Sequence, residues 1–310
     1  MHVPAIDAAQ GVELVAACDV ELARAQAIAA PRGAAAYADW RDMLERERLD
    51  LLWVCTPPLH HRGPAVEALA RGIHVYLEKP IARTLEDAEA IVEAAGAAAG
   101  VCAVGYQWHA SELLDRTREA LSGEPVGMLV GRNYGPVAGR PWFVDQELGG
   151  GQILERGSHH IDLQRAIAGE IEAVEAFAGS ARLALPDTDS TIDDAIALVL
   201  HFRAGALGTV HSAWSRDGQP ELYATDVLAG EATISLQLGP EAYRISGLAR
   251  GRPLDAASGD PMQRSIGAFL DAARSGDGSR VFCRPDDALR TLAVALACER
   301  ALLAGGTVAV

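Results

Sequence analysis

Basic residues are scarce in this chain of 310 residues, where 27 lysines and arginines stand against 42 aspartates and glutamates, a net charge of −15. Nucleic acids and anionic membrane surfaces both attract basic proteins, so the sequence argues against either partner. No stretch reaches the roughly 18 uncharged apolar residues of a membrane-spanning helix, and no secretory signal precedes the first motifs. Because 49% of the residues are apolar, we expect large cores and, at this length, two domains.

Cysteine is rare as well, and its spacing excludes the usual metal and disulfide patterns. The five cysteines lie far apart and form no C-x-x-C pair: Cys18, Cys55, Cys102, Cys283 and Cys298. We predict that they are small buried side chains in a reducing compartment, which places the protein in the cytoplasm. No metal site is predicted.

The sequence also lacks a G-x-G-x-x-G turn, the glycine-rich loop that holds a dinucleotide pyrophosphate at a helix N-terminus. A strand-like run nevertheless ends at Asp19, and such an acid normally follows the glycines by about 20 residues. The expected loop would therefore lie at or before Met1. We expect a chain that begins late, through a misplaced start or a real truncation. The alternative is a domain that never bound a nucleotide.

Strand-like and helical runs alternate along the first third of the chain. The apolar runs 12–18, 51–55, 73–77 and 101–106 are separated by helical runs at 21–30, 64–71 and 84–99. This alternation is typical of a parallel sheet with helices on both faces. We predict an α/β fold whose residues 1–120 form a Rossmann-like, doubly wound parallel sheet without its first strand.

The pattern changes after about residue 122, where strands follow one another with short turns. Strand-like runs occupy 126–134, 171–178, 195–202, 207–214, 222–228 and 232–238, and helical runs occupy 153–168, 262–275 and 285–304. Consecutive strands of this kind indicate an antiparallel sheet. We predict that residues 121–310 form an α+β domain with a largely antiparallel sheet.

Two short motifs end strands of the first domain. Cys55-Thr56-Pro57-Pro58 follows one apolar run, with His61 three residues further on, and Glu78-Lys79-Pro80 follows the next. Doubly wound sheets bind ligands at the carboxyl ends of their strands. A lysine there can hold a developing alkoxide, so Lys79 is a candidate catalytic residue.

The densest signal follows Gly149-Gly150-Gly151. On a helix, Glu155 and His159 share a face, and Asp162 lies three residues beyond His159. An imidazole flanked by carboxylates suits a general base. The same spacing could hold a metal, but no cysteine or further histidine cluster completes such a site. His160 is expected to face away and to serve packing.

Together these residues resemble the glucose–fructose oxidoreductase and inositol dehydrogenase family (Gfo/Idh/MocA). The resemblance rests on Asp19, the CTPP motif with His61, the EKP triplet, Gly105-Tyr106-Gln107, and GGG followed by H-x-x-D. It implies an NAD(P)-dependent oxidoreductase that acts on the alcohol or carbonyl carbon of sugars, cyclitols and related molecules. It also implies that the first domain binds the dinucleotide and the second binds substrate and forms oligomers.

The resemblance assigns roles to particular residues. Lys79 and His159 resemble the catalytic lysine and acid/base histidine, with Glu155 tuning the histidine where many members carry aspartate. Cofactor-lining positions are Asp19, Thr56, Pro57, His61, Glu78, Lys79 and Gln107. Asp162 is predicted to contact substrate, and Arg140, Trp142 and Asp145 are candidates because an Arg–Trp–acid set can bind a polyol. A loop tryptophan can equally pack at a subunit interface.

The cofactor and partner predictions follow. A carboxylate at Asp19 repels a 2′-phosphate, so NAD is favoured over NADP. We expect small-molecule substrates and a homodimer or homotetramer. Two alternatives remain open, both motivated by the missing glycine loop: a non-catalytic sensor or regulator on the same fold, and an inactive fragment truncated at its N-terminus.

Overall fold

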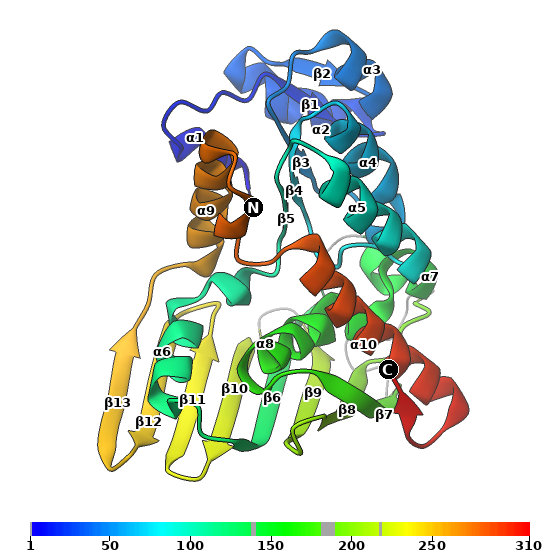
Figure 1. Cartoon of the computed structure of the whole chain (residues 1–310). Helices are drawn as coiled ribbons and strands as arrows, with labels where there is room; N and C mark the ends of the chain where they lie inside the picture. The colour runs from blue at the N-terminus through cyan, green and yellow to red at the C-terminus, as the bar shows by residue number, and fades with distance from the viewer. Residues whose placement is uncertain (1, 138–140, 181–189, 217–218) are drawn as a thin grey trace.

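A computed structural model describes residues 2–137, 141–180, 190–216 and 219–310 (Figure 1). The N-terminal part is built from parallel strands with helices beside them. The C-terminal part is a broad sheet with helices on one face. Helix α9 (Pro261–Ser275) follows the last strands of the broad sheet in the sequence but lies beside the N-terminal part (Figure 1). The N-terminal part therefore includes one helix from the C-terminal half of the chain.

Parallel pairing defines the N-terminal part. Strands β1 (Ala16–Cys18) and β2 (Ala35–Tyr37) form one parallel sheet, and β3 (Leu51–Val54), β4 (His74–Leu77) and β5 (Cys102–Val104) form another. The helices are α1 (Val3–Ala8), α2 (Leu22–Ala29), α3 (Trp40–Arg46), α4 (Arg62–Ala70) and α5 (Leu85–Ala97). The predicted fold class is confirmed, with the described strands divided between two parallel sheets.

Burial explains why these short runs form strands. In β4, Val75, Tyr76 and Leu77 are fully buried, as expected for a strand covered on both faces. Helix α5 begins at the cap that the sequence indicates, because the Thr84 hydroxyl accepts the Asp87 N–H at 3.2 Å. Strand ends and helix starts therefore meet at one edge of the sheet, where Thr56 and Lys79 follow β3 and β4.

The C-terminal part is a sheet of nine described strands in the order β13-β12-β11-β10-β6-β9-β8-β7-β14. Strands β6 and β9 pair in parallel and the other neighbours pair antiparallel. The bounds are β6 (Val126–Pro136), β7 (Ile171–Gly179), β8 (Ala195–Phe202), β9 (Leu207–Ser215), β10 (Leu222–Ala229), β11 (Ala232–Leu238), β12 (Tyr243–Ala249), β13 (Arg252–Ala257) and β14 (Val308–Ala309).

One face of this sheet is covered and the other is open. Helices α6 (Glu112–Leu121), α8 (Ser158–Ala168) and α10 (Pro285–Ala304) contact the covered face (Figure 1). Burial alternates along the strands, so that Leu129, Leu198 and Val210 are fully buried while their neighbours in sequence are not. The open face therefore consists of every second residue of the strands.

Sequence patterns missed several elements: β2, α3, α6, β12 and β13. Strand β12 holds Gly247 and a polar exposed face, which obscures the alternation. Helix α6 lies between the two predicted domains but contacts β11 and β12. We keep the division at about residue 120 as a proposal.

Within the described part of the chain, no helix is long and apolar enough to cross a membrane.

Candidate active site

The turn after β4 places Lys79 against the second domain. Its ammonium donates to the backbone carbonyl of Glu155 at 2.7 Å and lies 2.8 Å from the Glu155 carboxylate. Both side chains are largely buried, with 10% and 14% of their surfaces exposed. The Lys79–Pro80 peptide bond is cis. The N-terminal and C-terminal parts of the chain therefore meet at one ion pair.

Glu155 lies in a π-helical turn, Ile153–Gly157, that leads into α8. In a π turn a carbonyl bonds five residues ahead instead of four, and such turns are frequent at functional sites. Within this turn, the Glu155 carbonyl accepts the hydrogen bond from Lys79. Burial raises the pKa of the Glu155 carboxyl, and the Lys79 charge opposes this rise. The lysine is thus held by two oxygens of the same residue.

His159 begins α8 one turn beyond Glu155 and is surrounded by aromatic rings. Its ring centroid lies 5.9 Å from that of Tyr106 and 5.1 Å from that of Trp108. Its Nδ1 atom is buried without a hydrogen-bond partner among the described residues. Burial, followed by the charges of Lys79, His160 and Arg156, lowers the pKa of His159 well below its ordinary value. The imidazole is therefore neutral at neutral pH.

Glu78 of the EKP triplet is held beside the lysine. One carboxylate oxygen lies 2.5 Å from Nε2 of His2, and the other accepts the Lys79 backbone N–H at 3.0 Å. Burial raises the pKa of Glu78, but the hydrogen bond and charge of His2, with the charge of Lys79, outweigh it and lower that pKa overall. An ionised Glu78 braces the turn that carries Lys79.

The expected cofactor-lining residues occupy the carboxyl ends of the parallel strands. Asp19 follows β1, is half-exposed, and accepts the Glu21 N–H at 2.9 Å through one carboxylate oxygen. Thr56 after β3 is exposed, and Pro57 and Gln107 are half-exposed. The role of these positions in binding a dinucleotide stays a prediction. The turn that would hold the pyrophosphate is not in the printed sequence.

His61 makes contacts that its sequence position did not indicate. The side chain is fully buried, with Nε2 2.8 Å from the Thr56 carbonyl and Nδ1 3.2 Å from the Ile81 carbonyl. It therefore joins the CTPP turn to the EKP turn, and its contact with a cofactor stays a prediction. Burial lowers its pKa, so it acts as a neutral brace. Sequence spacing showed that His61 lies near the crevice, but not that its ring turns inward.

Asp162 contacts other residues of the protein, and its role as a substrate contact stays a prediction. Its side chain is fully buried, accepts the Thr291 hydroxyl at 3.1 Å, and lies 3.2 Å from Nδ1 of His109. Both oxygens are thus engaged by the protein itself. The reason is the turn of α8, which directs Asp162 toward α10 while His159 faces Tyr106 and Trp108.

Around Asp162 the fold assembles a cluster that sequence spacing does not reveal. Donor atoms of His109, Asp162, Cys283 and Asp287 lie within 4.8 Å of one another, and these residue types can hold metals. Arg165, however, donates to Asp287 at 3.0 Å. The two ring nitrogens of His109 face Asp162 and Asp287. We interpret the cluster as an ion-pair network that joins α8 and α10.

The loop before the three glycines is described only in part. Arg140 lies outside the described residues. Trp142 is half-buried and its ring packs on Phe143 at a centroid distance of 4.2 Å. Asp145 caps α7 (Gln146–Gly149) by accepting two backbone N–H groups, so this carboxylate has a structural role. Its participation in substrate binding stays a prediction, as does that of Trp142.

Two features of the crevice were missed or misplaced by sequence reasoning. Cys55 was expected to be buried but is exposed, because it follows the last residue of β3 at the open edge of the sheet. Arg156 was not singled out, although it adjoins Glu155 and packs on Trp214 and Tyr223. Its position next to a predicted catalytic acid was the signal available. Nothing in the sequence indicates that it is buried.

Comparison with protein families now identifies the chain. Residues 1–106 match the NAD-binding Rossmann fold of the oxidoreductase family GFO/IDH/MocA, and residues 122–226 match the GFO/IDH/MocA C-terminal domain. The protein belongs to this family of NAD(P)-dependent oxidoreductases, as the sequence motifs predicted. The NAD(P)-binding Rossmann-type domain is thereby confirmed.

Relatives agree with that assignment. D-xylose 1-dehydrogenase (NADP(+)) 2 of Haloferax volcanii is 24% identical over 90% of this chain and 86% of its own length. Myo-inositol 2-dehydrogenase of Thermotoga maritima is 26% identical over 57% of this chain, a match that spans 54% of that protein. The WlbA dehydrogenase of Bordetella pertussis, in complex with NADH and UDP-GlcNAcA, superposes with a TM-score of 0.83 at 23% identity and covers 100% and 94% of the two chains.

Proposed function

We propose that this protein transfers a hydride between nicotinamide and a secondary alcohol or carbonyl carbon of a sugar, cyclitol or related small molecule. The observation that carries the proposal is the junction of Lys79 and Glu155 one helical turn from His159. An ammonium and a neutral imidazole are the two groups that such a reaction requires from the protein. The dinucleotide supplies the hydride chemistry when it is bound.

His159 is the group that moves the proton. Because its Nδ1 atom is buried and has no partner within the described chain, Nε2 is the nitrogen available to a substrate hydroxyl. The lowered pKa keeps that nitrogen unprotonated at neutral pH, as a base requires. In the reverse direction the imidazolium is a strong acid toward the forming alkoxide.

Lys79 is the group that holds the reacting oxygen. An ammonium has three N–H donors, and Glu155 takes two of them through its carbonyl and its carboxylate. The third is left for the substrate oxygen, on which negative charge develops as the proton leaves. A charge fixed before the reaction stabilises that oxygen without further reorganisation. Glu155 therefore orients the lysine, in addition to its predicted influence on His159.

Turnover is the direct test of this proposal. NADH binding is measured by fluorescence titration, and NAD(P)-dependent oxidation is then screened with aldoses, glycosides and cyclitols. We expect binding and turnover with at least one of these classes. NADH binding without turnover of any of them would favour the sensor or regulator alternative, and absence of binding would contradict the proposal.

Asp19 sets the cofactor preference that we expect. Its half-exposed carboxylate follows β1, where it can accept hydrogen bonds from the adenine ribose hydroxyls and repel a 2′-phosphate. NADH should bind about tenfold or more tightly than NADPH. In Asp19→Ser the preference should fall toward equality, because the repulsion is removed. Parallel fluorescence titrations measure both, and tighter binding of NADPH by the unmodified chain would refute the argument.

We further propose that the open face of the nine-stranded sheet joins two copies of this chain. In-register positions on β9, β6, β10 and β12 carry a row of exposed apolar residues: Leu207, Met128, Leu228 and Leu248, exposed by 39%, 37%, 39% and 49%. Thr233 of β11 lies within the row. A row of this kind, apolar except for Thr233, on an uncovered sheet face is a usual association surface.

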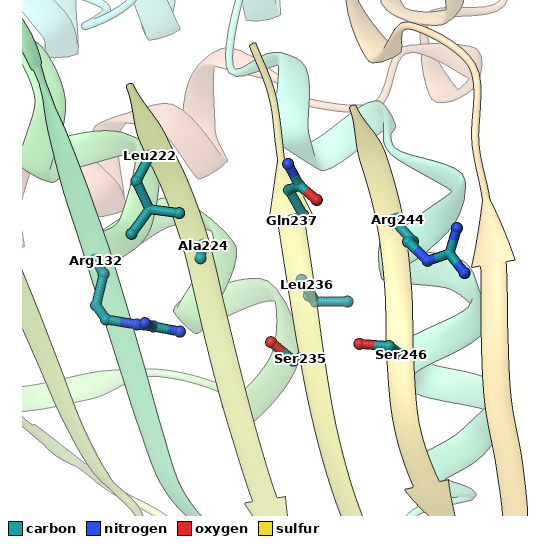
Figure 2. Close-up of a pocket in the computed structure, with 8 residues that line it drawn as sticks. All are labelled: Arg132, Leu222, Ala224, Ser235, Leu236, Gln237, Arg244 and Ser246. Atoms are coloured by element: carbon teal, nitrogen blue, oxygen red, sulfur yellow. The ribbon is translucent and has the colours of Figure 1, made fainter. Parts of the chain in front are cut away.

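Charge on the same face is self-complementary. A shallow pocket of about 290 Å³ lies over β6, β10, β11 and β12, lined in part by Arg132 and Arg244 (Figure 2). Arg132 pairs with Asp226 at 2.8 Å, and Arg244 pairs with Asp255. Each arginine lies beside an aspartate. The arginines of one copy can therefore pair with the aspartates of a second copy that is related to the first by a two-fold axis. The face thus fits a homodimer, from which a tetramer can be built.

Disrupting the apolar row should change the oligomeric state. The double variant Leu228→Glu/Leu248→Glu places two charges in the row, so we expect dissociation to monomers with unchanged circular dichroism. The matched control is Leu303→Glu at the end of α10, where the side chain is 92% exposed and a new charge should have no effect. Light scattering at micromolar concentration gives the masses. A monomeric unmodified chain would contradict the interface.

A cytoplasmic location is proposed on the state of the cysteines. None of the five forms a disulfide in the structure, although disulfides are common in proteins exposed to oxidising compartments. Burial raises the pKa of Cys102 and Cys298 to about 12, so these thiols are unreactive core residues. Mass spectrometry with and without an alkylating reagent on protein from fresh lysate would show whether all five thiols are free in the cell.

A further inference from the structure

One short turn and one helix of this protein are joined at two neighbouring points. The 3₁₀ turn η3 (Gln107–Ala110) carries Trp108 and His109 side by side, and helix α8 carries His159 and, three residues further on, Asp162. The ring centroids of Trp108 and His159 lie 5.1 Å apart. Nδ1 of His109 lies 3.2 Å from a carboxylate oxygen of Asp162. The first contact is made by the proposed general base, and the second ties together the same two segments.

The orientation of the His159 ring depends on its aromatic neighbours. Its Nδ1 atom is buried and has no hydrogen-bond partner within the described chain. A catalytic imidazole is usually oriented by a hydrogen bond at its other nitrogen, so packing must supply the orientation here. The rings of Tyr106 and Trp108, at 5.9 and 5.1 Å, provide that packing. Both residues belong to η3 or directly precede it, so whatever fixes η3 also fixes the angle of the imidazole.

His109 is the side chain that ties η3 to the helices. Nδ1 lies 3.2 Å from Oδ2 of Asp162 on α8, and Nε2 lies 3.7 Å from Oδ2 of Asp287 near the start of α10. An ionised carboxylate accepts hydrogen bonds and does not donate them. Each ring nitrogen therefore carries a proton, and His109 is an imidazolium held between two acids. Its side chain is only 12% exposed, and buried polar networks that are satisfied in this way make the elements that they join rigid.

The two acids that clamp His109 are held by neighbours of their own. Thr291 of α10 donates to the other oxygen of Asp162 at 3.1 Å, and Arg165 of α8 donates to Asp287 at 3.0 Å. The remaining charged residues on the surrounding elements are paired as well: Arg165 with Glu170, Arg290 with Glu170, Asp286 and Asp287, and Arg264 of α9 with Asp115 of α6.

The charges around His109 favour its protonated form. Burial lowers the pKa of His109, but the charge and hydrogen bond of Asp162, with the charge of Asp287, outweigh burial and raise that pKa overall. Arg118 of α6 opposes the rise. The Cys283 thiol adjoins the same acids and is neutral, because burial raises its pKa well above the ordinary value. The direction of the shift agrees with the imidazolium that the geometry requires.

We propose, on the basis of the function above, that His109 is a positioning residue: clamped between Asp162 and Asp287, it fixes η3 and thereby the Trp108 ring that orients His159. The clamp acts through the Trp108 ring and does not touch the reacting atoms. Without the clamp, η3 can move relative to α8. The imidazole then keeps its place in the helix but loses its packed orientation.

The first test follows the His159 ring protons by NMR in the cofactor-free protein. The spectra are recorded at neutral pH, where the lowered pKa keeps this ring uncharged, and the signal is assigned from its loss in His159→Gln. Ring currents of the aromatic neighbours displace the signal, so in His109→Gln we expect it to move toward the usual histidine position. The matched control is His201→Gln on β8, which removes an exposed histidine paired with Glu175 at 3.3 Å and should leave the signal in place. An unchanged signal in His109→Gln would overturn the proposal.

A second variant cuts the same hydrogen bond from the other side. Asp162→Asn keeps an acceptor for Thr291 but removes the charge that faces His109. We expect the same displacement of the His159 signal, also if His109→Gln folds poorly. In the double variant His109→Gln/Asp162→Asn the displacement should be no larger than in either single variant, because one bond is removed in all three. Displacements that add up would show independent roles and contradict the clamp.

The pH dependence of stability separates a clamp from simple packing. Because the pKa of His109 is raised on folding, its ion pairs stabilise the fold fully below about pH 6.5, the value of an unfolded histidine, and lose this effect as the pH rises through the folded value. The unmodified chain should therefore melt at a higher temperature than His109→Gln in mild acid, and the difference should shrink as the pH is raised. A difference that is the same at every pH would make His109 a packing residue and refute the clamp.

Turnover gives a further readout that depends on the proposed function. With a substrate in hand, kcat of His109→Gln should fall by about 10- to 100-fold, because the base is no longer held at the productive angle. His109→Arg keeps a cation between the two acids and should restore most of kcat and the position of the His159 signal. Full activity in a variant whose His159 signal is displaced would overturn the positioning role. If no substrate is found, the NMR and melting experiments still decide on His109, so the two proposals fail separately.

Discussion

Replacing Lys79 with methionine is expected to lower kcat by about 10³-fold, because the charge that holds the reacting oxygen is removed from a largely buried site. Methionine keeps the length of the side chain but offers no donor. Binding of NADH should change far less, since the dinucleotide contacts that we propose are spread over Asp19, Thr56 and Gln107. Steady-state kinetics with the best substrate, together with an NADH titration, measure the two effects separately.

Stability must be controlled in this experiment. In Lys79→Met the Glu155 carboxylate is left without its partner, and breaking a buried pair in this way costs about 3 kcal/mol of folding free energy. The double variant Lys79→Met/Glu155→Gln removes the stranded charge, so it should recover most of the stability but none of the activity. If instead activity returned with stability, Lys79 would be a structural residue and the mechanism would be wrong.

Replacing His159 with asparagine is expected to lower kcat by about 10²- to 10³-fold, the range usual for a lost general base. The residual rate should increase steadily with pH, because solvent hydroxide must then take the proton. The unmodified enzyme should show a rate that stays constant from neutral pH well into the acid range. That plateau follows from the lowered pKa of His159, which delays protonation to lower pH.

A matched control is available at the next residue. His160 is fully buried and its Nδ1 lies 3.1 Å from the Thr225 hydroxyl, on the side of α8 that faces β10. Burial lowers its pKa to about 3, so it is a neutral packing residue. His160→Asn should reduce the melting temperature while leaving the pH dependence of kcat/KM unchanged. A change of pH profile in His160→Asn equal to that in His159→Asn would refute the distinction between the two.

Local patterns were sufficient for much of the fold. Strands β8 and β11 and helix α10 occur over the residues that the apolar runs indicated, because each is long and its burial pattern is regular. The missed strands β12 and β13 have exposed polar residues and lie at the edge of the sheet. Both pair with strands that adjoin them in the sequence, β12 with β11 and β13 with β12, so what hid them is the absence of a regular apolar alternation.

By itself, the sequence determined the family, the succession of a parallel and a largely antiparallel sheet, and the candidate roles of the EKP lysine and of the glutamate and histidine that follow the three glycines. Motifs carry this information because residue type and spacing are enough to recognise them. Tertiary structure alone decided which side of each element faces the crevice. It turned His61 and Asp162 inward, widened the helix at Glu155 into a π turn, and buried Arg156 within that turn. These outcomes depend on packing between residues as many as 129 positions apart, and packing sets the burial that fixes each group's charge.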